Sequence, residues 1–194
     1  MQSIQKDLNA RFPTTAAAEK AGYFRYTNED KTGAISYANL QWTSSDPRHP
    51  SQLWYDVHGN LLGADFSVPT SAYASAPSLW GINPQRWFKF RAPHVHFVLQ
   101  RPDGTLQYTV ATRGSTFVAA GGDLNNPQPA VLAKLDPKKV GGLAPCTTAC
   151  KVVKVFTFPS IWDLIVWVKP NPSGAFADAN PLVHPSANAG KGEM

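Results

Sequence analysis

The sequence predicts a mainly β fold with a minor α component: an antiparallel β-barrel or sandwich of about seven to eight strands. An N-terminal helix and one further short helix complete the expected architecture. Six tryptophans and ten phenylalanines supply a large apolar area, and hydrophobic residues make up 43% of the chain. Seventeen prolines and fourteen glycines indicate many turns. Short stretches that alternate between apolar and polar residues lie between these turns, as in half-buried strands.

A length of 194 residues suits one domain. We therefore expect a single β-rich domain over residues 1–183 and a flexible tail over 184–194, where small and polar residues predominate. Helical segments are expected near residues 4–10 and 16–21, because Pro13 separates them, Thr14 or Thr15 can cap the second, and Gly22 can end it. A further short helix is expected over 126–136.

Two hairpins are the clearest strand signals, because each pair of alternating segments flanks a glycine-containing turn. The segment between residues 69 and 93 contains little regular pattern and is rich in aromatic residues, so we expect it to cover one mouth of the sheet as a lid or plug. The expected strands lie at 34–42, 52–57 with 61–68, 94–99 with 105–112, 152–158, and 161–168.

The net charge of +5 is only mildly basic, and the lysines and arginines are scattered along the chain. A nucleic-acid-binding protein usually concentrates them on one face, so we do not expect a nucleic-acid partner. No run approaches the roughly 20 apolar residues that a membrane-spanning helix needs.

The first twelve residues lack the apolar segment of a signal peptide, which fits either a cytoplasmic protein or the mature part of an exported one. Charged residues make up only 16% of the chain, and Cys146 and Cys150 are close enough in sequence to pair. Both features favour a secreted or periplasmic protein with a disulfide. A metal-binding or a reduced cysteine pair are the alternatives.

His94 and His96 are the most informative candidates for chemistry. Side chains alternate along a strand, so the two imidazoles are expected side by side, about 6–7 Å apart. They supply half of a site for one divalent transition metal such as zinc, copper or iron. His58 is the expected third metal ligand, with Asp56, Asp65 or Asp163 as substitutes. The alternative is that one imidazole packs and hydrogen-bonds while the other faces solvent.

Asp65 is unusual because it interrupts an otherwise apolar strand, LLGADFSV. It is expected either at an edge or solvent-facing position or as a charge beside the histidine pair, where His94, His96 and Asp65 would form an acid–base site. The sequence contains no G-x-S-x-G motif and no phosphate-binding glycine loop, which argues against a serine hydrolase and a nucleotide-binding enzyme.

Aromatic side chains near these histidines suggest a surface for a small aromatic or anionic ligand. In Trp87–Arg91, aromatic and cationic residues alternate, which is also typical of a half-buried strand with its basic side chains in solvent. The candidate ligand-binding residues are Trp54, Tyr73, Trp80, Trp87 and Arg91.

The C-terminal run WDLIVWVKPNPSGAFADANPLV (162–183) and the hairpin motif GNLLGADF (59–66) together resemble an uncharacterised family of small exported bacterial proteins. The shared ending is W-x-V-x-P-N-P-x-G-x-F-A-x-x-N-P, and members also have a tryptophan followed by a His-rich strand, here Trp87 and His94-Val95-His96. The family has no established activity to carry over. Where relatives have histidines in the last strand and after the upstream tryptophan, this chain has Ile165 and Phe88.

Together these observations predict an exported small-molecule or metal-binding protein with a pocket around His94 and His96 beneath the aromatic loop, with metal-dependent or acid–base enzyme activity as one form of that function. The alternative is a non-catalytic ligand-carrier or interaction module in which both histidines are structural.

Overall fold

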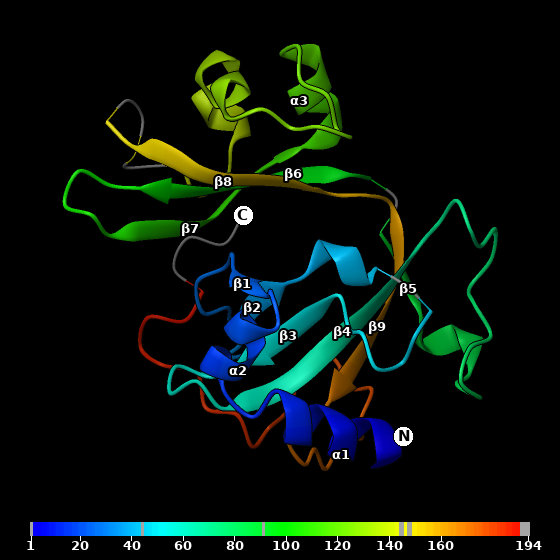
Figure 1. Ribbon diagram of the computed structural model, residues 1–194. Helices are drawn as coiled ribbons and strands as arrows, with labels where there is room; N and C mark the ends of the chain where they lie inside the picture. Colours follow the sequence, from blue (N-terminus) through cyan, green and yellow to red (C-terminus); the bar gives the residue numbers. More distant parts are fainter. Residues whose placement is uncertain (1, 44, 91, 144–145, 147–148, 191–194) are drawn as a thin grey trace. The chain divides into compact units, whose positions relative to one another are not determined.

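The computed structural model describes residues 2–43, 45–90, 92–143, 146 and 149–190 (Figure 1). The chain divides into two compact units, each built around one antiparallel sheet. The large unit contains residues 2–25, 29–90 and 160–190, and the small unit contains residues 26–28 and the described part of 92–159. The single domain predicted over residues 1–183 and the flexible tail predicted over 184–194 stay predictions. Within that tail, the Ser186 backbone N–H donates a hydrogen bond to Glu29 Oε1 (2.7 Å).

The prediction of a mainly β, antiparallel fold is confirmed. Nine strands occur among the described residues, in a six-stranded sheet of order β1-β2-β3-β4-β9-β5 and a three-stranded sheet of order β7-β6-β8. Each sheet is open at both edges, so neither forms a closed barrel by itself. The strands are β1 (Phe24–Arg25), β2 (Ile35–Ala38), β3 (Gln52–Tyr55), β4 (Leu61–Pro69), β5 (Phe88–Phe90), β6 (His94–Gln100), β7 (Leu106–Arg113), β8 (Lys151–Phe158) and β9 (Ile161–Trp167).

Helices are short, and the two at the N-terminus follow the sequence prediction. In the second, the Thr14 hydroxyl accepts a hydrogen bond from the Ala17 N–H, as expected of a capping residue. The α-helices are α1 (Gln2–Arg11), α2 (Thr15–Lys20) and α3 (Gly114–Ala119), and the 3-10 helices span Leu40–Trp42, Pro84–Arg86, Pro129–Lys134 and Pro137–Lys139. The helix expected over 126–136 is thus a 3-10 helix, and the strand expected over 34–42 ends at Ala38.

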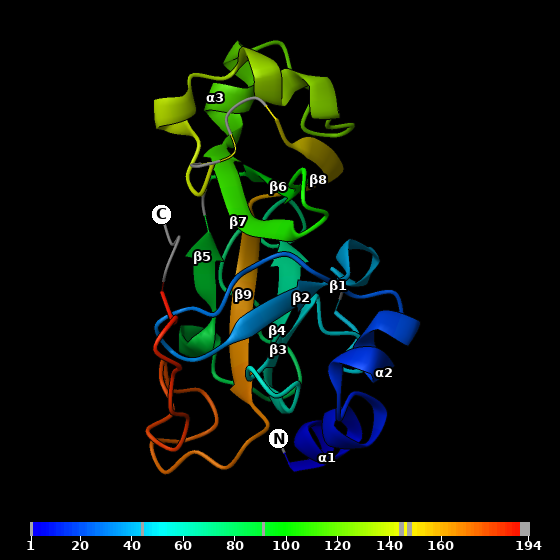
Figure 2. The ribbon, with the colours of Figure 1, turned by 90° about the vertical axis from the view of Figure 1, so that its left-hand side faces the viewer.

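The large unit has its main core between the six-stranded sheet and the N-terminal helices, which lie on one side of that sheet (Figure 1). Leu8 of α1 and Ala18 of α2 pack with Phe66 of β4 and Leu164 of β9, and all four are fully buried. β4 and β9 run side by side in the middle of the sheet (Figure 2). β4 pairs with β3 along one edge and with β9 along the other, and its residues 61–68 are buried.

The small unit buries the opposite side of its strands from the one that carries the histidines. Val95, Phe97 and Leu99 of β6 pack against Phe117 of α3 and Val131 of the 3-10 helix. The sequence contains no feature that predicts helix α3. Its N-cap residue makes no side-chain capping bond, and Thr and Val are weak helix formers. The burial of Phe117 accounts for this helix.

The C-terminal run that carries the family resemblance closes a loop back onto the end of β9. The Trp167 N–H donates to the Ala175 carbonyl (2.8 Å), and the Trp167 indole N–H donates to the Ala177 carbonyl (2.6 Å). The Asn180 side-chain amide donates to the Pro170 carbonyl (3.0 Å). In this chain Trp167 and Asn180, which both lie within this run, therefore have structural roles.

None of the helices in the described part of the chain combines the length and the apolar character needed to cross a membrane.

Candidate functional site

His94 and His96 lie on the same face of β6, as strand alternation predicts, with ring centroids 4.9 Å apart. The β6–β8 register places Phe158 opposite His94 and Phe156 opposite His96. Each imidazole stacks on its opposite phenyl ring, at 5.3 Å for His94 and 5.2 Å for His96. Tyr26 approaches His96 edge-on at 4.9 Å. We call these five residues the histidine–aromatic cluster.

Tyr26 is held in this cluster by an unusual backbone conformation in β7. Thr109 has a φ of 63°, a left-handed conformation that β-branched residues rarely adopt. In it, the Thr109 N–H donates to the Tyr26 carbonyl (2.9 Å), and the Thr109 hydroxyl accepts from the Asn28 N–H (2.7 Å). Strained backbone of this kind persists where the surrounding structure requires it, often at functional sites.

Both histidines are neutral at neutral pH. Burial lowers the pKa of His96 to about 3, with a smaller contribution from His94, and burial also lowers the pKa of His94. His96 is 8% exposed, and its Nδ1 has no hydrogen-bond partner among the described residues. The cluster therefore contains a buried, uncharged nitrogen that the described part of the chain leaves unsatisfied.

The three histidines predicted to bind a metal belong to different units of the chain. His58 lies exposed in the turn between β3 and β4 of the large unit, where its N–H donates to Asp56, whereas His94 and His96 belong to the small unit. Within the described ranges, no three His, Cys, Asp or Glu side chains form a group that could hold a metal ion. A zinc, copper or iron ion bound by these histidines stays a prediction.

Asp65 is buried, so the expectation of an edge or solvent-facing position is wrong. It lies in β4, a central strand, and is 6% exposed. Its neighbour is Asp163 of β9, which is 4% exposed and lies one diagonal step across the sheet, since Asp65 is opposite Ile165. Asp65 belongs to the large unit and the two histidines to the small one, so the acid–base grouping of Asp65 with His94 and His96 stays a prediction.

A hydrogen-bond network surrounds these two aspartates. The Trp54 indole N–H donates to Asp65 Oδ2 (3.0 Å), and the Ser67 hydroxyl donates to Asp163 Oδ1 (2.6 Å). The Ser51 and Ser67 hydroxyls are 2.5 Å apart, and Ser51 is also within 3.2 Å of the Asp65 carbonyl. Burial raises the pKa of Asp65 well above its usual value, with the Asp163 charge adding to the shift, and burial raises the pKa of Asp163 to about 7.

The predicted aromatic ligand-binding residues do not form one surface. Trp80 and Trp87 pack into the main core of the large unit, with Trp80 against Phe66 (5.2 Å), and Tyr73 borders the same core. Trp54 packs with Trp167 in a separate cluster. Its neighbours along β3 point into the main core, and because side chains alternate along a strand, Trp54 points to the opposite face of the sheet. Arg91 lies outside the described residues.

The aromatic loop over residues 69–93 is more ordered than the sequence suggested. Its Phe88–Phe90 segment forms β5, which pairs with β9, and Lys89 lies over the Trp162 ring at 5.0 Å. The Trp162 indole N–H donates to the Tyr73 carbonyl (2.9 Å). Within the large unit, this segment completes the sheet and its core.

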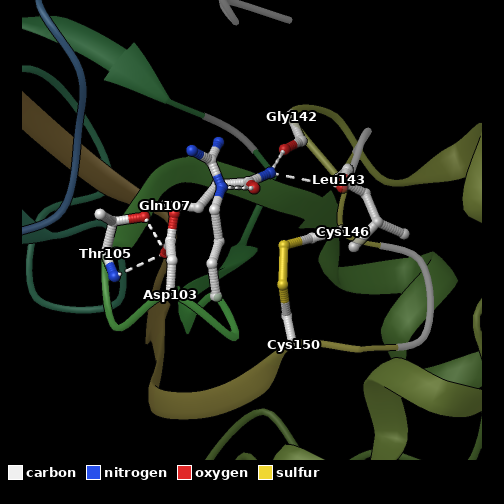
Figure 3. The surroundings of a disulfide bond; sticks show 8 residues. Asp103, Thr105, Gln107, Gly142, Leu143, Cys146 and Cys150 are labelled. Atoms are coloured by element: carbon white, nitrogen blue, oxygen red, sulfur yellow. Dashed lines mark hydrogen bonds between the residues drawn. A yellow bond between two sulfur atoms is a disulfide. The ribbon is translucent and has the colours of Figure 1, made fainter.

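The disulfide between Cys146 and Cys150 is confirmed, with a Cα–Cα distance of 5.6 Å (Figure 3). Beside it, the Gln107 side-chain amide donates to the carbonyls of Gly142 and Leu143, and the Arg101 Nε–H donates to the side-chain oxygen Oε1 of Gln107. The two cysteines border a hollow of about 330 Å³ whose wall includes Leu99, Leu132 and Leu143.

Sequence reasoning missed the pairing of Asp65 with Asp163, although a signal was present. Two apolar strands, LLGADFSV and IWDLIVW, each contain a single central acid, and adjacent pairing of these strands would bring the acids together. The aromatic partners of the histidines had no such signal, because Phe156 and Phe158 are ordinary alternating residues of a strand.

Comparisons with models of protein families, with curated proteins and with solved structures found no match to this chain.

Proposed function

We propose that this chain is an exported small-molecule-binding protein whose ligand is held at the histidine–aromatic cluster. The observation that supports the proposal most directly is the Nδ1 atom of His96, which is buried among aromatic rings without a hydrogen-bond partner among the described residues. An unsatisfied buried polar atom costs about 1–3 kcal/mol. A ligand that bonds to this nitrogen would recover that energy on binding.

The chemistry of the cluster favours a planar, uncharged aromatic ligand with a hydroxyl group. The rings of Tyr26, Phe156 and Phe158 surround His96 with an aromatic environment, and neutral His96 can exchange a hydrogen bond with a hydroxyl. An anionic ligand is disfavoured, because neither imidazole carries a charge at neutral pH. Phenol is the simplest probe with these properties.

Titration with phenol, followed through the imidazole Hε1 resonances by NMR, tests this proposal. Saturable shifts are expected at His94 and His96, with no change at exposed His58. His96→Phe retains a packed ring but removes the nitrogen, so phenol affinity should fall at least tenfold, about 1.4 kcal/mol. His58→Gln is the matched control and should bind as the wild type does.

Two other results would contradict the proposal in different ways. If phenol shifts no histidine resonance while the protein stays folded, the cluster is structural and the non-catalytic interaction module becomes the better account. If Zn²⁺ instead binds stoichiometrically, and binding is lost in both His94→Ala and His96→Ala, the metal-binding form of the function replaces the aromatic ligand.

Export is supported by the Cys146–Cys150 disulfide, since such bonds persist mainly in oxidising compartments. Protein alkylated at cell lysis and then denatured without reductant should have no free thiol. Reduction should lower the free energy of unfolding by about 2 kcal/mol, the chain-entropy value for so short a loop. The double variant Cys146→Ser, Cys150→Ser should not respond to reductant. Two free thiols in the protein from its own cells would count against export.

A further inference from the structure

Asp65 and Asp163 are two buried acids that the described structure leaves without a neutralising cation. Neither forms an ion pair with a lysine, arginine or histidine anywhere in the described residues. They lie diagonally across the β4–β9 pair, and the charge of Asp163 raises the pKa of Asp65. Moving a single carboxylate out of water costs several kcal/mol, and two carboxylates in contact also repel each other.

Each carboxyl group accepts one hydrogen bond from a neighbouring side chain, and one oxygen of Asp65 has no hydrogen-bond partner among the described residues. Trp54 donates to Asp65 Oδ2, and Ser67 donates to Asp163 Oδ1. Ser51 lies within hydrogen-bond distance of both Ser67 and the Asp65 main-chain carbonyl, and its single hydroxyl proton serves one of them at a time. Asp65 Oδ1 receives no hydrogen bond from any described donor. A carboxylate accepts only, so the contact between the two acids becomes a hydrogen bond only if one of them is protonated.

The other groups around the pair reinforce this requirement. Across the strands, Gln52 and Ile165 are opposite Asp65, while Ser67 and Phe88 are opposite Asp163. None of these four residues is charged. Asp30 also acts on Asp65, and its negative charge further disfavours ionisation.

We propose that Asp65 and Asp163 form a proton-binding site that retains one shared proton at neutral pH, so that the folded chain loses stability as the pH rises. This inference is independent of the proposed ligand site, because it concerns the six-stranded sheet alone. It also gives Asp65 a role different from that of a catalytic base: a proton donor to, or acceptor from, its neighbour.

The direction of the pH dependence follows from proton binding in the two states. In the unfolded chain an aspartate releases its proton near its ordinary pKa of 3.8, whereas in the folded chain burial raises both pKa values, that of Asp163 to about 7 and that of Asp65 well above 3.8. Unfolding in this window releases a proton, so the unfolding constant rises about tenfold per pH unit. His96 acts in the opposite direction below pH 6.5, because its pKa is lowered in the fold. The contribution of the pair is therefore measured as a difference between variants.

Asp163→Asn provides that difference, since its amide has the shape of a protonated carboxyl and can donate to Asp65. Denaturant unfolding at pH 5, 6 and 7 should show the unfolding constant of the wild type rising roughly 50- to 100-fold relative to that of Asp163→Asn. The unfolding constant of the wild type should rise by the same factor relative to that of Asp65→Asn. The matched control, exposed Asp178→Asn, should follow the wild-type profile.

A direct measurement on the wild type keeps the inference testable even if the asparagine variants do not fold. With ¹³C-labelled aspartate, NMR at pH 7 should show one buried carboxyl carbon with the shift of a protonated acid. Two fully ionised carboxylates at pH 7, or an Asp163→Asn profile parallel to that of the wild type, would overturn the proposal.

Discussion

Trp167→Ala is expected to lower the free energy of unfolding by about 3–5 kcal/mol, the usual range when a buried tryptophan is truncated. Trp167 is 1% exposed and lies at the end of β9, where its ring meets Trp54 at 5.5 Å in an edge-to-face arrangement. The truncation leaves a cavity beside Trp54 and removes the indole hydrogen bond to Ala177. Denaturant unfolding monitored by circular dichroism measures the loss.

Trp167→Phe separates packing from hydrogen bonding, because it retains an aromatic ring and removes only the indole N–H. We expect it to lose clearly less stability than Trp167→Ala, and amide exchange over residues 175–183 should accelerate in both variants. The exposed aromatic Phe90→Ala is the control, since Phe90 is 50% exposed and its replacement should change stability by less than about 0.5 kcal/mol. A loss below 1 kcal/mol for Trp167→Ala would contradict this account of the C-terminal motif.

Gly63→Ala is expected to lower the free energy of unfolding by about 3 kcal/mol, at the upper end of the range for overpacking. Gly63 lies in β4 opposite Trp54 and Trp167. A Cβ atom there would lie 2.7 Å from the Val166 carbonyl oxygen and 2.8 Å from the Trp54 ring, closer than such atoms approach. The sheet backbone cannot yield readily, so the Trp54 ring must move, which also disturbs its hydrogen bond to Asp65.

A double-mutant cycle identifies the cause of this loss. In a Trp54→Leu background the clash with the ring is removed and only that with the Val166 carbonyl oxygen is left, so Gly63→Ala should cost at least 1 kcal/mol less than in the wild type. Equal losses in the two backgrounds would mean that the tryptophan ring is not the obstacle. Thermal unfolding of the four proteins at one pH is sufficient for the comparison.

Local sequence signals predicted the elements that depend on local chemistry. The turn at Gly59 adopts a φ of +80°, which glycine tolerates, and the strands on either side pair as β3 and β4. Thr14 caps α2 as expected. The placement of His94 beside His96 and the pairing of Cys146 with Cys150 follow from short spacings in the chain. In each case residues within a few positions of one another supply the interactions.

The features that sequence reasoning missed depend on contacts between distant segments. Asp65 and Asp163 are separated by almost a hundred residues, and only the pairing of β4 with β9 makes them neighbours. The sequence predicts that Trp80 and Trp87 bind a ligand, but in the structure both pack into the core around Phe66. An aromatic side chain has the same composition signal whether it packs in a core or faces a ligand, so sequence alone does not distinguish these roles.

The sequence by itself therefore determined the antiparallel β class, the hairpins, the N-terminal helices, the shared face of the two histidines and the disulfide. The tertiary structure alone decided that Asp65 is buried, that its partner is Asp163, and that Tyr26, Phe156 and Phe158 surround the histidines. The physical reason is the separation in sequence between the residues that interact. Turns, caps and alternation are set by neighbouring residues, whereas burial and pKa are set by strands that the chain brings together only on folding.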